Sequence, residues 1–123
     1  MRITDIDKIP GTAELATFAS SAGQAWGRWE GTPPTDSSCF VEVDIPDPVS
    51  AWEPAQGADA LTGTAEEILN VCAVADSVDH DGIVALRLAS DIILVAWEAV
   101  DRPSPGERIH SSTSRVELYP YQL

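Results

Sequence analysis

Positive charge is scarce in this chain. Its 123 residues include seven lysines and arginines against twenty aspartates and glutamates, a formal net charge of −13, and Lys8 is the sole lysine. A surface of this sign repels the phosphates of nucleic acids and of anionic membranes, so we expect neither as a partner. Carboxylates attract basic proteins, and the composition therefore predicts a basic protein partner.

Cysteine and histidine are scarce too. Cys39 and Cys72 lie in apolar segments without CxxC spacing, which is typical of buried free thiols. His80 and His110 do not have the spacing of paired metal ligands. Glycine-rich phosphate loops and nucleophile elbows are absent. The sequence therefore predicts no cofactor and favours a protein that is not an enzyme.

Long apolar runs are missing as well. No window approaches the roughly 18 apolar residues of a membrane span. Residues 1–8 lack the apolar centre of a signal peptide, so we expect a cytoplasmic protein. A chain rich in alanine, aspartate and arginine with one lysine is typical of GC-rich bacterial genomes. The length fits a single domain over residues 1–123.

What the chain does contain is a series of short β-rich segments. The most apolar, residues 83–98, breaks once at residues 89–91 and predicts a β-hairpin. Residues 67–75 fit a strand or a capped helix. We favour a strand, because Asp81-Gly82 between two apolar runs is a hairpin signal. Residues 67–98 are then a three-stranded antiparallel meander.

Further strands are expected on both sides of the meander. In residues 39–45 apolar Val41, Val43 and Ile45 alternate with Phe40, Glu42 and Asp44, so one face is polar. Residues 108–110 and 115–119 predict two more short strands near the C-terminus.

Two helical segments are also expected. Apolar residues at helical spacing between 11 and 24 predict an N-terminal helix, and Asp47-Pro48 predicts a short helical turn that ends before Pro54. The predicted fold is mainly β (α+β): a small antiparallel barrel or sandwich of five or six strands. The order of its strands loosely resembles an OB-type barrel.

Candidate binding residues are aromatic or acidic and lie beside loops and strand ends. They are Trp26, Trp29, Trp52, Glu42, Asp44, Tyr119 and Tyr121. Asp79 and Asp81 match the spacing of two calcium ligands in an EF-hand loop and are a candidate metal site. Leu88 replaces the glutamate that such a loop needs at its end, and a solvated hairpin turn explains the same residues.

Three functions agree with these features. The favoured one is a small acidic, non-enzymatic interaction protein, such as an inhibitor or immunity-type protein that masks a basic partner. The first alternative is a ligand-binding barrel whose pocket is lined by Trp26, Trp29 and Trp97. The second is an acid–base enzyme that uses His80 or His110 with carboxylates. Exposed edge strands would also permit a homo-oligomer.

Overall fold

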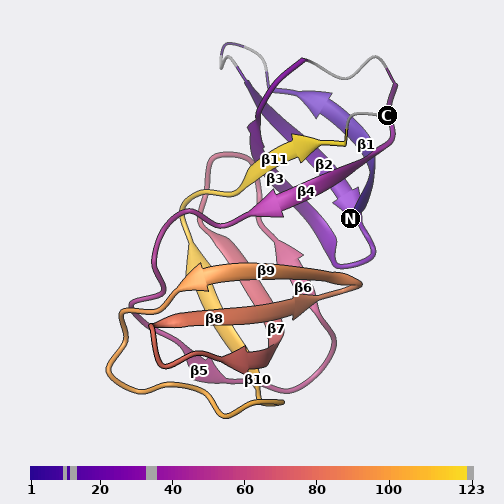
Figure 1. Ribbon diagram of the computed structural model, residues 1–123. Coiled ribbons are helices and arrows are strands. Elements are labelled where there is room, and N and C mark those ends of the chain that lie inside the picture. Colours follow the sequence, from indigo (N-terminus) through magenta and orange to yellow (C-terminus); the bar gives the residue numbers. More distant parts are fainter. Residues whose placement is uncertain (10, 12–13, 33–35, 122–123) are drawn as a thin grey trace.

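The fold comes from a computed structural model, which describes residues 1–9, 11, 14–32 and 36–121. Over these residues the chain forms eleven β-strands and no helix. None of the described segments is therefore a helix long and apolar enough to cross a membrane. The strands form a closed barrel and a second sheet packed beside it (Figure 1).

Five strands close the barrel in the order β1-β2-β3-β11-β4. They are β1 (Arg2–Lys8), β2 (Leu15–Ser20), β3 (Gly23–Trp29), β4 (Cys39–Asp44) and β11 (Glu117–Pro120). β11 lies between two strands from the first 44 residues of the chain, parallel to β3 and antiparallel to β4. Gly27 lets β11 approach β3, because a Cβ there would lie 3.0 Å from Leu118 Cγ and 3.2 Å from the carbonyl oxygen of Val116.

The second sheet is built around the long strand β7. Its strands are β5 (Glu53–Pro54), β6 (Ala60–Thr62), β7 (Leu69–Val78), β8 (Ile83–Leu88), β9 (Asp91–Ala96) and β10 (Arg108–Thr113). The order is β5-β10-β7-β8-β9, and β6 also pairs with β7. Every pairing in this sheet is antiparallel.

One hydrophobic cluster extends through both parts of the molecule, from Ile3 and Val41 in the barrel to Leu86 and Val95 in the second sheet. Strand β6 also joins the two parts through the main chain. The N–H of Leu61 donates to the carbonyl of Ala22 at 3.0 Å. The two parts therefore share both a core and main-chain hydrogen bonds.

The expected meander is confirmed. β7, β8 and β9 pair in sequence, and Gly82 adopts a positive φ of 87° in the Asp-Gly turn. The strand expected at residues 39–45 is β4, with Val41 and Val43 buried and Glu42 exposed. Arg87 is exposed on β8, and its Nε lies 3.5 Å from a carboxylate oxygen of Asp76.

The prediction of an N-terminal helix is wrong. Within residues 11–24 the described chain forms β2, a turn at Ser21 and Ala22, and the start of β3. The helical spacing relied on alanines, which also fit the two-residue repeat by which Ala16 and Phe18 are buried. Gly23, the first residue of β3, has a φ of 124° next to the hairpin turn.

The short helical turn after Asp47 is also absent. Val49 instead forms a parallel bridge with Trp97, and the chain then enters the two-residue strand β5. Five of the eleven strands lie outside the expected ones. β5 and β6 are too short to leave a clear pattern, β1 lies in a mixed segment, and β2 and β3 cover the segment predicted as a helix and the residues after it. The parallel contact between β3 and β11 corrects the expectation of a purely antiparallel fold.

Candidate functional site

The outer surface of β4 and β11 carries acidic and aromatic side chains in facing positions. Tyr119 lies opposite Glu42 and Glu117 lies opposite Asp44 in the antiparallel register. All point away from the core, because alternate residues of a strand face opposite sides. With the neighbouring Glu30 and two further aromatics, they form what we call the acidic–aromatic face. Its residues are Glu30, Phe40, Glu42, Asp44, Glu117, Tyr119 and Tyr121.

Three aromatic side chains of this face are largely open to solvent. Phe40 is 57% exposed, Tyr121 is 54% exposed and Tyr119 is 41% exposed. Phe40 and Tyr121 are held together by the main chain, since the N–H of Tyr121 donates to the carbonyl of Phe40 at 3.1 Å. Exposed rings on paired strands are pre-positioned, so a partner that covers them would need little rearrangement of the backbone.

The carboxyl groups of the face repel one another. Partial burial, together with a hydrogen bond and charge repulsion from Glu30, raises the pKa of Glu117, and Asp44 adds to the effect. Partial burial followed by the charges of Glu117, Glu30 and Asp44 also raises the pKa of Tyr119. Both shifts have the sign expected for a crowded negative field, which a cation from outside would relieve.

Two arginines, Arg28 and Arg115, neutralise part of this field. Arg28 lies on β3, the strand next to β11, and is in register with Glu117. Its Nη2 lies 2.9 Å from a carboxylate oxygen of Glu14, and its Nε lies 3.2 Å from one of Glu30. The guanidinium therefore faces two carboxylates at the edge of the face, and the face as a whole stays negative.

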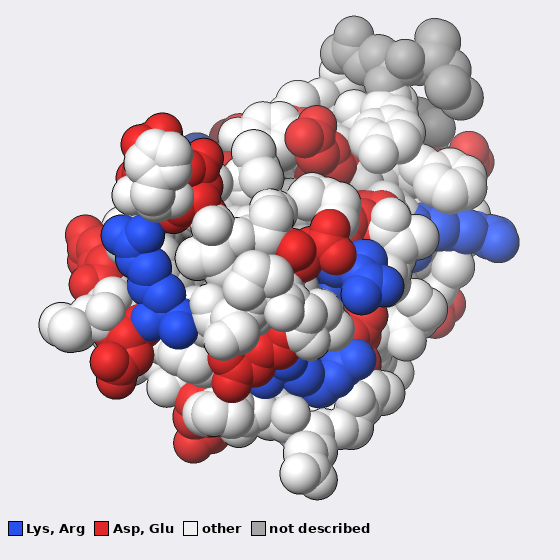
Figure 2. Space-filling view, turned by 60° about the horizontal axis from the view of Figure 1, so that its bottom comes forward, with Lys and Arg blue, Asp and Glu red and all other residues white. Residues whose placement is uncertain are grey.

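Charge is distributed differently on the second sheet. There each of three arginines meets an acceptor from an aspartate: Arg87 faces Asp76, Arg102 donates to the carbonyl of Asp79, and Arg108 pairs with Asp59. Figure 2 shows blue basic groups interleaved with red acidic ones on the side of the molecule turned to the viewer. The three arginines of this part of the molecule are thus each engaged by an aspartate.

The four tryptophans serve mainly as core. Trp26, Trp29 and Trp97 are each at most 7% exposed, and Trp52 is partly buried. Every indole N–H donates to a main-chain carbonyl, and those of Trp52 and Trp97 share the carbonyl of Asp101 at 2.8 and 3.0 Å. The structure thus places Trp26 and Trp29 beneath the surface, apart from the exposed rings of the acidic–aromatic face.

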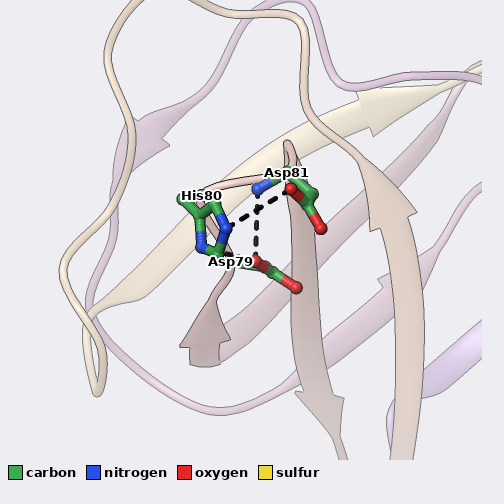
Figure 3. Close-up of side chains that lie close together, drawn as sticks. All are labelled: Asp79, His80 and Asp81. Atoms are coloured by element: carbon green, nitrogen blue, oxygen red, sulfur yellow. Dashed lines mark hydrogen bonds and ion pairs between the residues drawn. The ribbon is translucent and has the colours of Figure 1, made fainter.

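The candidate metal residues lie at the exposed turn between β7 and β8. Asp79, His80 and Asp81 point toward one another, and their possible ligand atoms lie within 4.8 Å (Figure 3). The imidazole nitrogens of His80 lie 3.2 Å from Asp79 and 3.5 Å from Asp81, and Asp79 also accepts a hydrogen bond from the N–H of Asp81 at 3.1 Å. These contacts are those of a stable Asp-Gly turn, so the cluster has a structural explanation without a metal.

The second histidine also meets a carboxylate. Nδ1 of His110 lies 3.2 Å from Glu53, and Nε2 lies 3.2 Å from the amide oxygen of Asn70. A hollow of about 270 Å³ adjoins it. Both ring nitrogens are engaged, so proton exchange with a substrate would first break one of these contacts.

Two larger hollows open on the surface. One of about 830 Å³ lies between the barrel and the residues after β6, and its walls include Asp5, Asp7 and Phe18. Another of about 490 Å³ is lined in part by Phe40 and Tyr121 and thus adjoins the acidic–aromatic face. Trp26, Trp29 and Trp97, which the ligand-binding alternative assigned to a pocket, line neither of them.

Sequence reasoning found most of the acidic–aromatic face but missed Glu30, Phe40 and Glu117. The alternating patterns of residues 39–45 and 115–119 already placed Phe40 beside Glu42, and Glu117 beside Tyr119, on polar faces. What no pattern indicated is that these two strands pair. Comparison of the chain with protein-family models, with curated proteins and with solved structures gives no match.

Proposed function

We propose that this chain is a small non-enzymatic interaction protein that binds and masks a basic partner protein through the acidic–aromatic face. The observation that supports this most is the crowding of Glu30, Asp44 and Glu117 next to the exposed ring of Tyr119. Carboxylates that repel one another gain most from an incoming cation. Lysine or arginine from a partner would relieve the repulsion between Glu117 and Glu30.

The aromatic rings supply the second part of such an interface. Tyrosine and phenylalanine at the centre of a contact provide much of the binding energy in protein complexes. The faces of their rings also attract guanidinium and ammonium groups, by about 0.5–1 kcal/mol at an exposed site. A partner rich in arginine would thus meet carboxylates and rings in alternation along β4 and β11.

The experiment is affinity capture from lysate of the source organism at low salt, with identification of the retained proteins by mass spectrometry. The bait is compared with a variant of the face, Glu42→Gln with Tyr119→Ala. The matched control, Asp81→Asn with Val100→Ala, also removes one exposed carboxylate and one exposed apolar side chain, but away from the face. We expect the bait and the control to retain the same basic protein, and the face variant to lose it.

The captured protein is then purified and titrated against each bait by calorimetry. Binding should weaken steeply when ionic strength rises from about 0.05 to 0.5 M, because a steering field of exposed charges is screened. Equal affinity for the face variant and the control would contradict the assignment of the interface. Capture of no basic protein by any bait would contradict the function itself.

A further inference from the structure

The hollow of about 490 Å³ lies where the barrel meets the second sheet. Its walls come from the start of β1, the turn between β2 and β3, the turn between β8 and β9, and the rings of Phe40 and Tyr121. Figure 1 shows the N-terminus beside the turn between β8 and β9, although the two are far apart in the sequence. Pockets for small ligands often form at such junctions and have volumes of about 300–1,000 Å³.

Arg2 is the one charged side chain of this hollow that has no partner in the described part of the chain. Asp91, the other charged side chain in the wall, pairs with the ammonium group of Met1, which also donates to the carbonyl of Val41 at 2.7 Å. Arg2 is exposed, and its guanidinium meets neither a carboxylate nor a carbonyl of the described residues. The walls therefore carry one uncompensated positive charge in a chain whose net charge is −13.

Two aromatic rings lie on the same face of the barrel as this guanidinium. Arg2 is directly opposite Phe40 in the antiparallel register of β1 and β4, and the main chain of Tyr121 is hydrogen-bonded to that of Phe40. The next residues, Ile3 and Val41, point the other way and are fully buried. Both rings are more than half exposed and line the hollow, so a flat apolar group in it could stack against them.

Hydroxyl groups supply the remaining polar contacts. Thr4, Ser20, Ser21 and Ser90 all line the hollow. The Oγ of Ser20 accepts a hydrogen bond from the N–H of Ala22 at 3.0 Å, which leaves its own hydrogen free to be donated. A guanidinium and hydroxyl groups together favour a ligand group that only accepts hydrogen bonds, such as an ionised acid.

The amount of charge distinguishes two kinds of acid. A guanidinium binds carboxylates and phosphates alike, through two parallel hydrogen bonds. A phosphate monoester carries about 1.5 to 2 negative charges at pH 7, whereas a carboxylate carries a single one. One carboxylate therefore balances the free charge of Arg2, and the excess charge of a phosphate would be repelled by the acidic surface around the hollow.

We propose that this hollow binds a small aromatic carboxylate, with the carboxylate on the guanidinium of Arg2 and the ring against Phe40 and Tyr121. The site does not depend on the proposed function, because it uses an arginine and not the carboxylates of the acidic–aromatic face. Phe40 and Tyr121 belong to both, however. A bound ligand would therefore compete with a partner protein that covers the acidic–aromatic face.

The probe for the test is naphthoate, and its binding to the whole untagged protein is followed by NMR titration of the amide signals. We expect the amides of Arg2, Ser21 and Ser90 to shift together along one saturating curve. Arg2→Gln should weaken binding at least tenfold, the effect of losing ~1.4 kcal/mol. The matched control is Lys8→Gln, which removes one exposed positive charge at the other end of β1 and should bind as the original does.

Three further measurements decide between the outcomes. Naphthamide has the same shape without the charge and should bind at least tenfold more weakly, so its equal affinity would overturn the role of Arg2. Naphthyl phosphate should also bind more weakly, and tighter binding would overturn the choice of a carboxylate. Arg2→Lys keeps the charge without the fork of parallel donors, and we expect an intermediate affinity even if Arg2→Gln does not fold.

The aromatic part of the site is tested with Phe40→Ala, which should weaken naphthoate binding several-fold. Affinity that neither Arg2→Gln nor Phe40→Ala changes would overturn the proposed site, as would the absence of saturable shifts at its amides. Neither result would bear on the capture of a basic partner, so the proposed function is tested separately.

Discussion

Arg108 and Asp59 form a close ion pair beside the second sheet, with Nη1 of the arginine 2.6 Å from Oδ1 of the aspartate. Both side chains are about one-quarter exposed, and the other oxygen of Asp59 accepts a hydrogen bond from the N–H of Ala89 at 2.8 Å. One carboxylate thus ties β10 to the turn between β8 and β9. Asp59→Ala should lower the free energy of unfolding by roughly 1–3 kcal/mol, measured by urea denaturation.

The exposed pair of Arg87 and Asp76, 3.5 Å apart, provides the control for that experiment. Asp76→Ala should cost less than about 0.5 kcal/mol, because solvent screens such pairs. Equal losses in the two variants would contradict a special role for Asp59.

The dependence of stability on pH should show the contribution of the Asp59 carboxylate. Burial alone would raise the pKa of Asp59, but the hydrogen bonds from Arg108 and Ala89 outweigh it and lower the pKa. A lowered pKa in the folded state stabilises the protein above the ordinary pKa of aspartate, near 3.9, and this stability is lost as the pH falls below it. The difference in stability between the original chain and Asp59→Asn should therefore shrink below about pH 4.

Glu117 should behave in the opposite way. Its pKa is raised in the fold by burial and by Glu30, so its contribution favours folding at low pH and is lost as the pH rises through the raised value. Glu117→Gln should stabilise the protein at pH 7 by roughly 0.2–1 kcal/mol, the cost of like charges on neighbouring strands. The gain should fade on acidification, as thermal unfolding across the pH range would show. An unchanged gain at pH 3 would mean that the repulsion has been misassigned.

Closure of the barrel should depend on Gly27. An added Cβ would meet Leu118 Cγ at 3.0 Å and the carbonyl oxygen of Val116 at 3.2 Å. Gly27→Ala is therefore expected to lower the free energy of unfolding by about 1–3 kcal/mol through overpacking. The single variant Leu118→Ala should also be less stable than the original protein, because it leaves a cavity. The double variant should lose less stability than the sum of the two single losses, because Leu118→Ala removes the side chain that the added Cβ meets. Strict additivity of the two losses would argue against this contact.

The thiol of Cys39 should react slowly. Burial first, and then the charge of Asp36, raise its pKa, so little thiolate is present at neutral pH. Alkylation by iodoacetamide at pH 7.5 should be slower than for a free cysteine peptide and faster in Asp36→Asn. Cys72 is 9% exposed and should stay unmodified until the protein unfolds. Rapid labelling of both thiols in the native protein would contradict the burial of these residues.

Much of the second sheet could be predicted from the sequence, because its strands follow one another and pair with their neighbours. Residues 67–98 required only a turn signal at Gly82 and continuous apolar runs. The barrel could not be predicted in the same way. The sequence of alanine-rich β2 fits both the repeat of a helix and the two-residue repeat of a strand. The pairing of β11 with β3 and β4 joins residues about 75 or more positions apart in the sequence.

The acidic–aromatic face could likewise be predicted only in part. The alternation of charge and aromatic residues marked Glu42 and Tyr119 as outward on separate strands. Only the register places them opposite each other. The burial of Trp26 and Trp29 could not be predicted from the sequence either, since large aromatic residues occur both in cores and at interfaces.

The place of β11 has a consequence for biosynthesis. The strand inserts between β3 and β4, so the barrel stays a sheet with two unpaired borders until residue 120 has emerged from the ribosome. The meander around β7 is complete well before that and can assemble from local contacts. The nascent chain would therefore carry a folded meander beside an open barrel, and residues 117–120 would decide whether the exposed strand borders close or aggregate.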